Sequence, residues 1–135
     1  MTSTAEIILP LAIDQTYTYL IPEEMLGILQ VGMRVEVPFG KSKTYSGMVM
    51  KISDENPTSA KLKYIQAQLD EKPIVNQRTL KLWQWISDYY LCTIGEVMLA
   101  GLAGGLKLVS ETILSLVEGK SIDSEPHSDD EYLIL

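Results

Sequence analysis

Hydrophobic and polar residues alternate most regularly between residues 33 and 39. Four hydrophobic side chains occupy every second position of this stretch, namely Met33, Val35, Val37 and Phe39. Because successive side chains of a β-strand point to opposite faces, the pattern predicts a strand with one buried face. Pro38 cannot donate a ladder hydrogen bond and Gly40 tolerates positive φ angles, so we expect the strand to end in a glycine turn at the sheet edge. A ligand can approach the backbone of such a turn closely.

Four further stretches have the length and composition of short strands, and Gly or Pro residues separate them: residues 6–9, 17–21, 45–52 and 63–69. In the second stretch, Tyr17 and Tyr19 share one face, whereas Thr18 lies on the other. Residues 112–117 are compatible with one more strand. Five to six short strands at this spacing predict a mainly β (α+β) fold, built on a small curved β-sheet or barrel.

After Pro73 the hydrophobic period becomes that of a helix. The positions that recur at helical spacing are Leu82, Trp85 or Ile86, and Tyr89. Asn76 is a suitable N-cap, so we expect the first of two C-terminal helices to begin there and to pack on the sheet. We interpret its aromatic residues as packing against the sheet, not as a stacking surface for bases: Trp83, Trp85, Tyr89 and Tyr90.

Thr93 and Glu96 have the spacing of a capping box, which predicts a second helix from there to about residue 102. The glycines at 104 and 105 then stop it, so we divide the chain into a first domain, residues 1–105, and a linker with the start of a second domain, residues 106–135. Another capping-box pattern, at residues 128–131, begins a helix about one turn before the sequence ends. Because an isolated helix that short is unstable, we expect the sequence to be a piece of a longer protein.

The composition excludes several classes of function. Cys92 and His127 are the single cysteine and histidine of the 135 residues, which excludes a disulfide framework, a Cys/His metal site and a Ser-His-Asp or Cys-His hydrolase. The sequence has no phosphate-binding Gly-x-x-x-x-Gly-Lys-Ser/Thr loop, so ATP hydrolysis cannot reside in these residues. It also has no apolar run of about 18 residues and no basic leader segment, so we expect no membrane span and a cytoplasmic location.

The net charge of −7 is unevenly distributed. Residues 106–135 contain two lysines and seven acidic residues, so residues 1–105 carry a net charge of only −2. A nearly neutral domain cannot coat duplex DNA through its whole surface, because that binding mode needs many phosphate contacts. It can still hold a short piece of nucleic acid in a pocket.

Three runs of residues resemble one known family: Tyr17-Thr18-Tyr19-Leu20-Ile21-Pro22, Val37-Pro38-Phe39-Gly40-Lys41, and Asp88-Tyr89-Tyr90 with Gly95-Glu96-Val97. In this order and spacing, residues 5–105 resemble the N-terminal domain of primosomal protein N′, the PriA family of replication-restart helicases. The resemblance implies a domain that binds the 3′ end of the nascent leading strand at a stalled fork. It also implies that residues 106–135 lead into a winged helix.

The resemblance implies further properties for the parent chain. The parent would be an ATP-dependent 3′→5′ DNA helicase with ATP, Mg and Zn as cofactors. Its partners would be DNA, other primosome proteins and single-strand-binding proteins. The present residues would themselves contain neither a catalytic site nor a cofactor.

Four residues take roles from the family by position. Tyr17 would stack on the terminal base, an interaction that contributes about 1–3 kcal/mol per base. The backbone of Gly40 would meet the base or sugar, and Lys63 would contact phosphate or the 3′-hydroxyl group. Thr18 stands where the family usually has an aspartate, and its hydroxyl can form a hydrogen bond but carries no negative charge.

Without the resemblance, the same residues have plainer interpretations. An aromatic residue in a strand, such as Tyr17, more often packs against its neighbours, and a lysine such as Lys63 is usually solvated. The acidic total charge and the lack of a basic stripe also support an alternative function. In that alternative, the domain is a β-barrel protein-interaction module of a replication complex and does not bind DNA directly.

Overall fold

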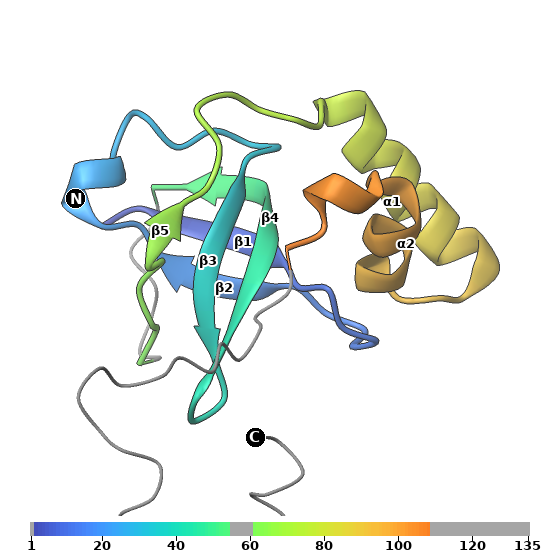
Figure 1. Cartoon of the computed structure of the whole chain (residues 1–135), viewed down its shortest axis with the longest axis horizontal. Coiled ribbons are helices and arrows are strands. Elements are labelled where there is room, and N and C mark those ends of the chain that lie inside the picture. The colour runs from blue at the N-terminus through green and yellow to red at the C-terminus, as the bar shows by residue number, and fades with distance from the viewer. Residues whose placement is uncertain (1, 55–60, 109–135) are drawn as a thin grey trace, which may run out of the picture.

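The computed structural model describes residues 2–54 and 61–108, which form a five-stranded antiparallel sheet and two α-helices (Figure 1). The strands are, in chain order, β1 (Thr4–Ile8), β2 (Tyr17–Leu20), β3 (Arg34–Phe39), β4 (Lys43–Ser53) and β5 (Ala67–Gln68). Their order in the sheet is β2-β1-β4-β3-β5. The mainly β, α+β prediction is therefore confirmed. The expected strand at 112–117 and the expected start of a winged helix lie outside the described residues.

The alternating pattern of β3 produces a strand with one buried face, as predicted. Met33, Val35 and Val37 are completely buried, and they pack in one core with Tyr19 and Ile21 from β2 and its end. Residues between them in the sequence remain partly exposed. β3 pairs with β4 from its first residue to its last, where Phe39 lies opposite Lys43. The turn that contains Gly40 therefore closes a regular hairpin.

The sheet is open, so the barrel variant of the prediction is not what the chain forms. Residues 63–65 touch the free edge of β2 through one parallel bridge, in which the amide of Leu20 donates to the carbonyl of Lys63 (2.9 Å). The chain then moves to β3, where β5 pairs over only two residues. The predicted strand at 63–69 is thus divided, because its two halves bond to different strands. β2 and β5 are the two edge strands of the sheet and do not pair with each other.

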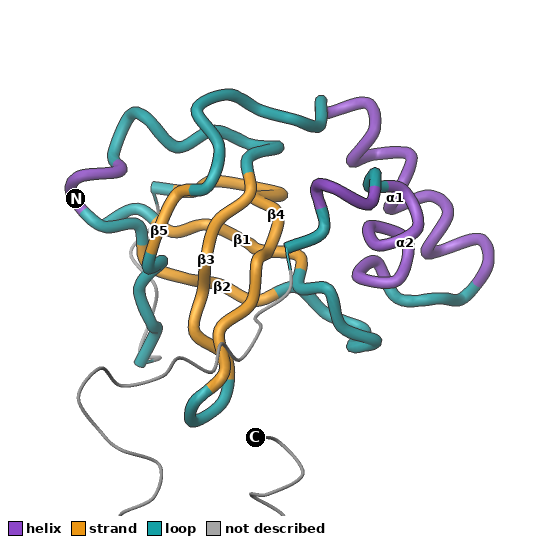
Figure 2. The backbone as a smooth tube through the Cα atoms, in the orientation of Figure 1, coloured by secondary structure: helices purple, strands orange, loops and turns teal. Residues whose placement is uncertain are grey.

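Helix α1 (Gln77–Tyr90) and helix α2 (Ile94–Gly101) lie together at one end of the sheet (Figure 2). Both predicted caps are present, because the side chain of Asn76 accepts from the amide of Thr79 and Thr93 forms a complete capping box with Glu96. Short 3-10 turns, η1 (Glu23–Met25) and η2 (Gly104–Leu106), complete the described elements. Within residues 2–54 and 61–108, no helix has both the length and the hydropathy needed to span a membrane.

The face of α1 that packs inward differs from the prediction. Trp83 is buried with Leu80 against α2 and the end of the sheet, as expected for a packing residue. In contrast, Trp85, Tyr89 and Tyr90 are 55%, 65% and 67% exposed. Trp85 and Tyr89 stack on one another, with ring centroids 5.0 Å apart. The interpretation of these three residues as packing against the sheet is therefore wrong. The cause is that α1 carries apolar residues on two faces, and α2 covers only one of them.

Candidate nucleic-acid interface

The tip of the β3–β4 hairpin and the segment before β5 meet at one rim of the sheet. Lys63 Nζ donates a hydrogen bond to the carbonyl oxygen of Gly40, at 2.7 Å. Gly40 is exposed, has a φ of 70°, and has open space where a Cβ would project. The predicted turn glycine and the predicted lysine are therefore in direct contact, although they are 23 positions apart in the sequence.

Tyr17 reaches the same rim through Phe39. The two rings meet edge to face with centroids 5.0 Å apart, and Phe39 directly precedes Gly40. Phe39 also meets Tyr45 edge to face at 5.9 Å. The Tyr17 ring is only partly buried, and its hydroxyl accepts a hydrogen bond from Gln15 Nε2 (2.8 Å). Three of the four predicted site residues are thus connected: Tyr17, Gly40 and Lys63.

Thr18 is placed differently from the other three. It is exposed and lies opposite Glu6 in the β1–β2 pairing, on the face away from the core that Tyr17 adjoins. No hydrogen bond within the described parts of the chain joins its side chain to Tyr17, Gly40 or Lys63. The alternation of side chains along β2 accounts for this separation, because neighbouring residues of a strand point to opposite faces.

Tyr19 fixes the position of the hairpin end, a role that the sequence did not reveal. Its buried hydroxyl donates to the carbonyl oxygen of Pro38, at 3.0 Å, and so joins β2 to the residues just before the turn. Burial, together with the neighbouring Tyr17, raises the pKa of Tyr19 above its ordinary value, so the hydroxyl remains a donor. The sequence signal for this role was the position of Tyr19 two residues after Tyr17, on the same face of the strand. The same alternation also fits a simple core residue, so the hydrogen bond could not be predicted from it.

Arg34 and Asp70 form the ion pair that ties β3 to the chain after β5. The Asp70 carboxylate accepts from both the Arg34 guanidinium (2.9 Å from Nε) and the Arg34 amide (2.8 Å). Arg34 Nη1 also donates to the carbonyl of Leu106 (2.8 Å), which holds η2 against the sheet. The side-chain hydrogen bonds from Arg34 lower the pKa of Asp70, although desolvation opposes them. The carboxylate is therefore ionised throughout the neutral range.

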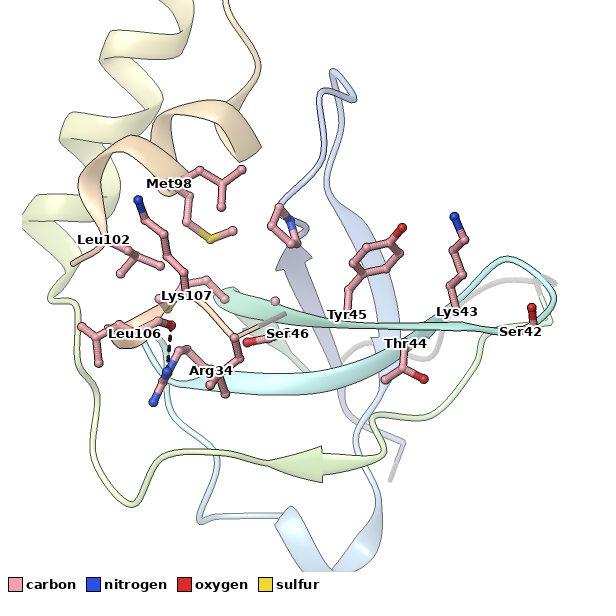
Figure 3. A pocket seen from close by; sticks show the side chains of 15 residues that line it. Arg34, Ser42, Lys43, Thr44, Tyr45, Ser46, Met98, Leu102, Leu106 and Lys107 are labelled. Carbon is pink, nitrogen blue, oxygen red and sulfur yellow. Dashed lines mark hydrogen bonds between the residues drawn. The ribbon is translucent and has the colours of Figure 1, made fainter. Parts of the chain in front are cut away.

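A cleft of about 560 Å³ lies between β4, α2 and η2 (Figure 3). Its polar side includes Ser42, Lys43, Tyr45 and Ser46, and its apolar side includes Met98, Leu102 and Leu106. Arg34 and Lys107 also line the cleft, whereas none of the described residues that line it is acidic. Nothing in the sequence indicated this cleft, because residues from distant parts of the chain form it.

Comparison with known proteins places the chain in a family. The family described as 3'DNA-binding domain (3'BD), of PriA, matches residues 6–103. The chain belongs to this PriA 3′ DNA-binding domain family. This agrees with the resemblance seen in the sequence. It also means that the rim formed by Tyr17, Gly40 and Lys63 belongs to a DNA-binding domain.

Three individual relatives all have the name replication restart protein PriA. The chain is 32% identical over 111 residues to the replication restart protein PriA of Bacillus subtilis, covering 82% of this chain and 14% of the relative. It is 36% identical over 93 residues to the PriA protein of Buchnera aphidicola subsp. Acyrthosiphon pisum, covering 68% and 12%. The PriA protein of Treponema pallidum is 28% identical over 100 residues. The chain therefore spans about one seventh of the length of these relatives.

Proposed function

We propose that this domain captures the 3′ end of a DNA strand, the nascent leading strand of a stalled fork, for a replication-restart protein. The observation that carries the proposal is the contact between Lys63 Nζ and the Gly40 carbonyl, next to the Phe39 and Tyr17 rings, in a member of a DNA-binding family. The rim offers an ammonium group, an exposed peptide and a partly exposed aromatic ring. These are the groups that a terminal nucleotide can use.

Each group has a distinct role in the proposed complex. The ring of Tyr17 stacks on the terminal base without regard to its identity. The Gly40 carbonyl accepts a hydrogen bond from the 3′-hydroxyl, and Lys63 donates to the sugar or to the phosphate on its 5′ side. Gly40 suits this role because the space beside its Cα is open. A 3′ terminus differs from internal DNA in its free hydroxyl, so this arrangement favours an end over a continuing strand.

Thr18 contributes less directly in this proposal. It stands at the aspartate position of the family, but its exposed hydroxyl has no negative charge and faces away from the Tyr17 ring. We expect a weaker preference for the 3′-hydroxyl than a carboxylate would give. The small net charge of residues 1–105 likewise implies modest affinity for this domain alone, since few phosphates are neutralised.

The parent protein belongs to the same proposal. We propose that it is an ATP-dependent 3′→5′ helicase, with ATP, Mg and Zn bound by residues outside this chain, acting in the cytoplasm with other primosome and single-strand-binding proteins. The relatives are named replication restart proteins, which supports this assignment. The alternative function, a protein-interaction module without DNA binding, is not favoured, because the chain belongs to a DNA-binding family.

The direct test compares two DNA strands of the same sequence that differ only in the group at the 3′ end. Fluorescence anisotropy should show tighter binding of the 135-residue chain to DNA with a 3′-hydroxyl than to the same DNA with a 3′-phosphate. A 5′-phosphate added to both strands controls for charge at the other end and should leave the preference unchanged. Equal affinity for the two 3′ ends would contradict end recognition.

A further inference from the structure

The cleft between β4, α2 and η2 begins at the hairpin that carries the proposed 3′-end rim. Ser42 and Lys43 line the cleft, and Lys43 pairs with Phe39, the residue just before Gly40. Figure 3 shows Lys43 near the hairpin end of β4 and Arg34 and Lys107 toward the other end of the cleft. The cleft therefore leads away from the rim along β4.

The charge of this cleft differs from that of the whole chain. Three of its lining residues are cationic, Arg34, Lys43 and Lys107, and none of the described lining residues is acidic. Arg34 is neutralised by Asp70. Within residues 2–54 and 61–108, neither Lys43 nor Lys107 has an ion-pair partner. In a chain with a net charge of −7, two lysines without an ion-pair partner among the described residues, in a cleft whose described lining includes no acidic residue, favour an anionic ligand.

The remaining lining suits an anion that also carries flat apolar groups. Lys43 and Tyr45 project to the same side of β4, whereas Thr44 projects to the other (Figure 3). Met98 and Leu102 line the cleft farther from the hairpin, beside Lys107 (Figure 3). Single-stranded DNA binds in such places, because basic side chains follow its phosphates while its bases contact aromatic and apolar surfaces. A free inorganic anion would leave the apolar side unused.

We propose that this cleft holds the nucleotides that immediately precede the 3′-terminal one. The proposal rests on the 3′-end function above and extends it from one nucleotide to a short strand. The part of β4 that lines the cleft, from Lys43 to Met48, is about 17 Å long at about 3.4 Å per residue. A stacked strand rises about 3.4 Å per nucleotide, so the cleft accommodates a few nucleotides and no more than about five.

The test compares a single nucleotide, which is too short to enter the cleft, with a strand that fills it. The probes are thymidine 5′-monophosphate, titrated by NMR, and a thymidine octanucleotide, titrated by fluorescence anisotropy at several salt concentrations; both have a 3′-hydroxyl. The double variant Lys43→Gln/Lys107→Gln should bind the mononucleotide with affinity within about twofold of the unmodified chain. For the octanucleotide, its slope of log affinity against log salt should fall by about 1.4, because each phosphate contact on a single strand contributes about 0.7.

Lys51→Gln is the matched control, because Lys51 lies on the same strand, outside the cleft, in an exposed ion pair with Glu6. It should leave the octanucleotide slope unchanged. If the double variant also leaves that slope unchanged, the cleft does not bind the strand and the inference is wrong. If the slope is unchanged but Lys63→Ala weakens binding of both probes, the proposed 3′-end function stands and only the inference about the cleft is lost. A loss of slope without any 3′-hydroxyl preference would instead support the cleft and contradict the end function.

Discussion

Lys63 donates its ammonium hydrogen bond to the backbone of Gly40, so one lysine from the segment before β5 is held against the tip of the β3–β4 hairpin. Both residues are exposed. The bond therefore contributes little to stability but places a charge beside an open peptide. This relationship determines what replacing either residue should do.

Lys63→Ala should weaken binding of DNA with a 3′-hydroxyl by about tenfold, because a charged hydrogen bond is worth about 1.5 kcal/mol or more. Its effect on the free energy of unfolding should stay within about 0.5 kcal/mol, since the side chain is exposed. Anisotropy and urea denaturation measure the two effects. Lys61→Ala, an exposed lysine two residues earlier, is the control. An equal loss of affinity in that variant would show that general charge, not position, explains the result.

Tyr17→Ala should reduce affinity for 3′-ended DNA by about 1–3 kcal/mol, the usual contribution of one base stacked on an aromatic ring. It should also destabilise the domain by about 1 kcal/mol, because the edge contact with Phe39 is lost. Tyr17→Phe separates the two causes, since it keeps the ring and removes only the hydroxyl that accepts from Gln15. Binding by Tyr17→Phe should match that of the unmodified chain. If Tyr17→Ala lost stability but no affinity, Tyr17 would be a packing residue only.

Gly40→Ala should lower the free energy of unfolding by about 1–2 kcal/mol, because an alanine is strained at the φ of 70° and no clash is involved. For a domain of this size, the midpoint of thermal denaturation should fall by roughly 4–8 °C per kcal/mol. Gly104→Ala is the matched control, since that glycine also has open space around it but no positive φ. It should leave the midpoint nearly unchanged. A similar fall in both variants would exclude backbone strain as the cause.

The sequence predicted the local elements well because their signals are local. The alternation in β3, the N-cap at Asn76 and the capping box at Thr93 each depend on a few neighbouring residues, and each is present in the structure. That Gly40 and Lys63 would belong to one site was expected only from the family resemblance, and their hydrogen bond was not predicted. Periodicity and spacing contain no information about which loops meet.

The predictions that were wrong or missing depend on contacts between residues that are far apart in the sequence. Helix α1 has one apolar face with Leu80 and Trp83 and a second with Trp85 and Tyr89. Periodicity predicts both faces equally, and only the position of α2 decides that the first is buried. Residues 63–69 are divided in the same way, because the first part bonds to the edge of β2 and the second part to the edge of β3. The sequence does not show where these two edges lie relative to each other. The cleft was not predicted because its lining residues on β4 and on α2 and η2 are about fifty or more positions apart in the sequence.

The Arg34–Asp70 pair gives the last prediction, a dependence of stability on pH. Hydrogen bonds from Arg34 lower the pKa of Asp70 in the folded chain, so the folded state binds a proton less readily than the unfolded state. The stabilisation is therefore present above the unfolded pKa of about 3.9 and is lost as the pH falls through the lower, folded pKa. Urea denaturation of the unmodified chain should show stability decreasing as the pH falls below about 5.

Asp70→Asn isolates the contribution of this pair from that of other carboxylates, such as Glu96, whose pKa is also lowered by its bonds to Thr93. The side chains of Arg34 and Asp70 are only 12% and 8% exposed, so an unpaired Arg34 should cost about 3 kcal/mol at pH 7. The difference between the two proteins should shrink as the pH falls below about 4, because Asp70 then takes up a proton first in the unfolded chain and, at lower pH, in the folded chain as well. A difference that stayed constant from pH 7 to pH 3 would mean that lost packing, not lost charge, destabilises the variant.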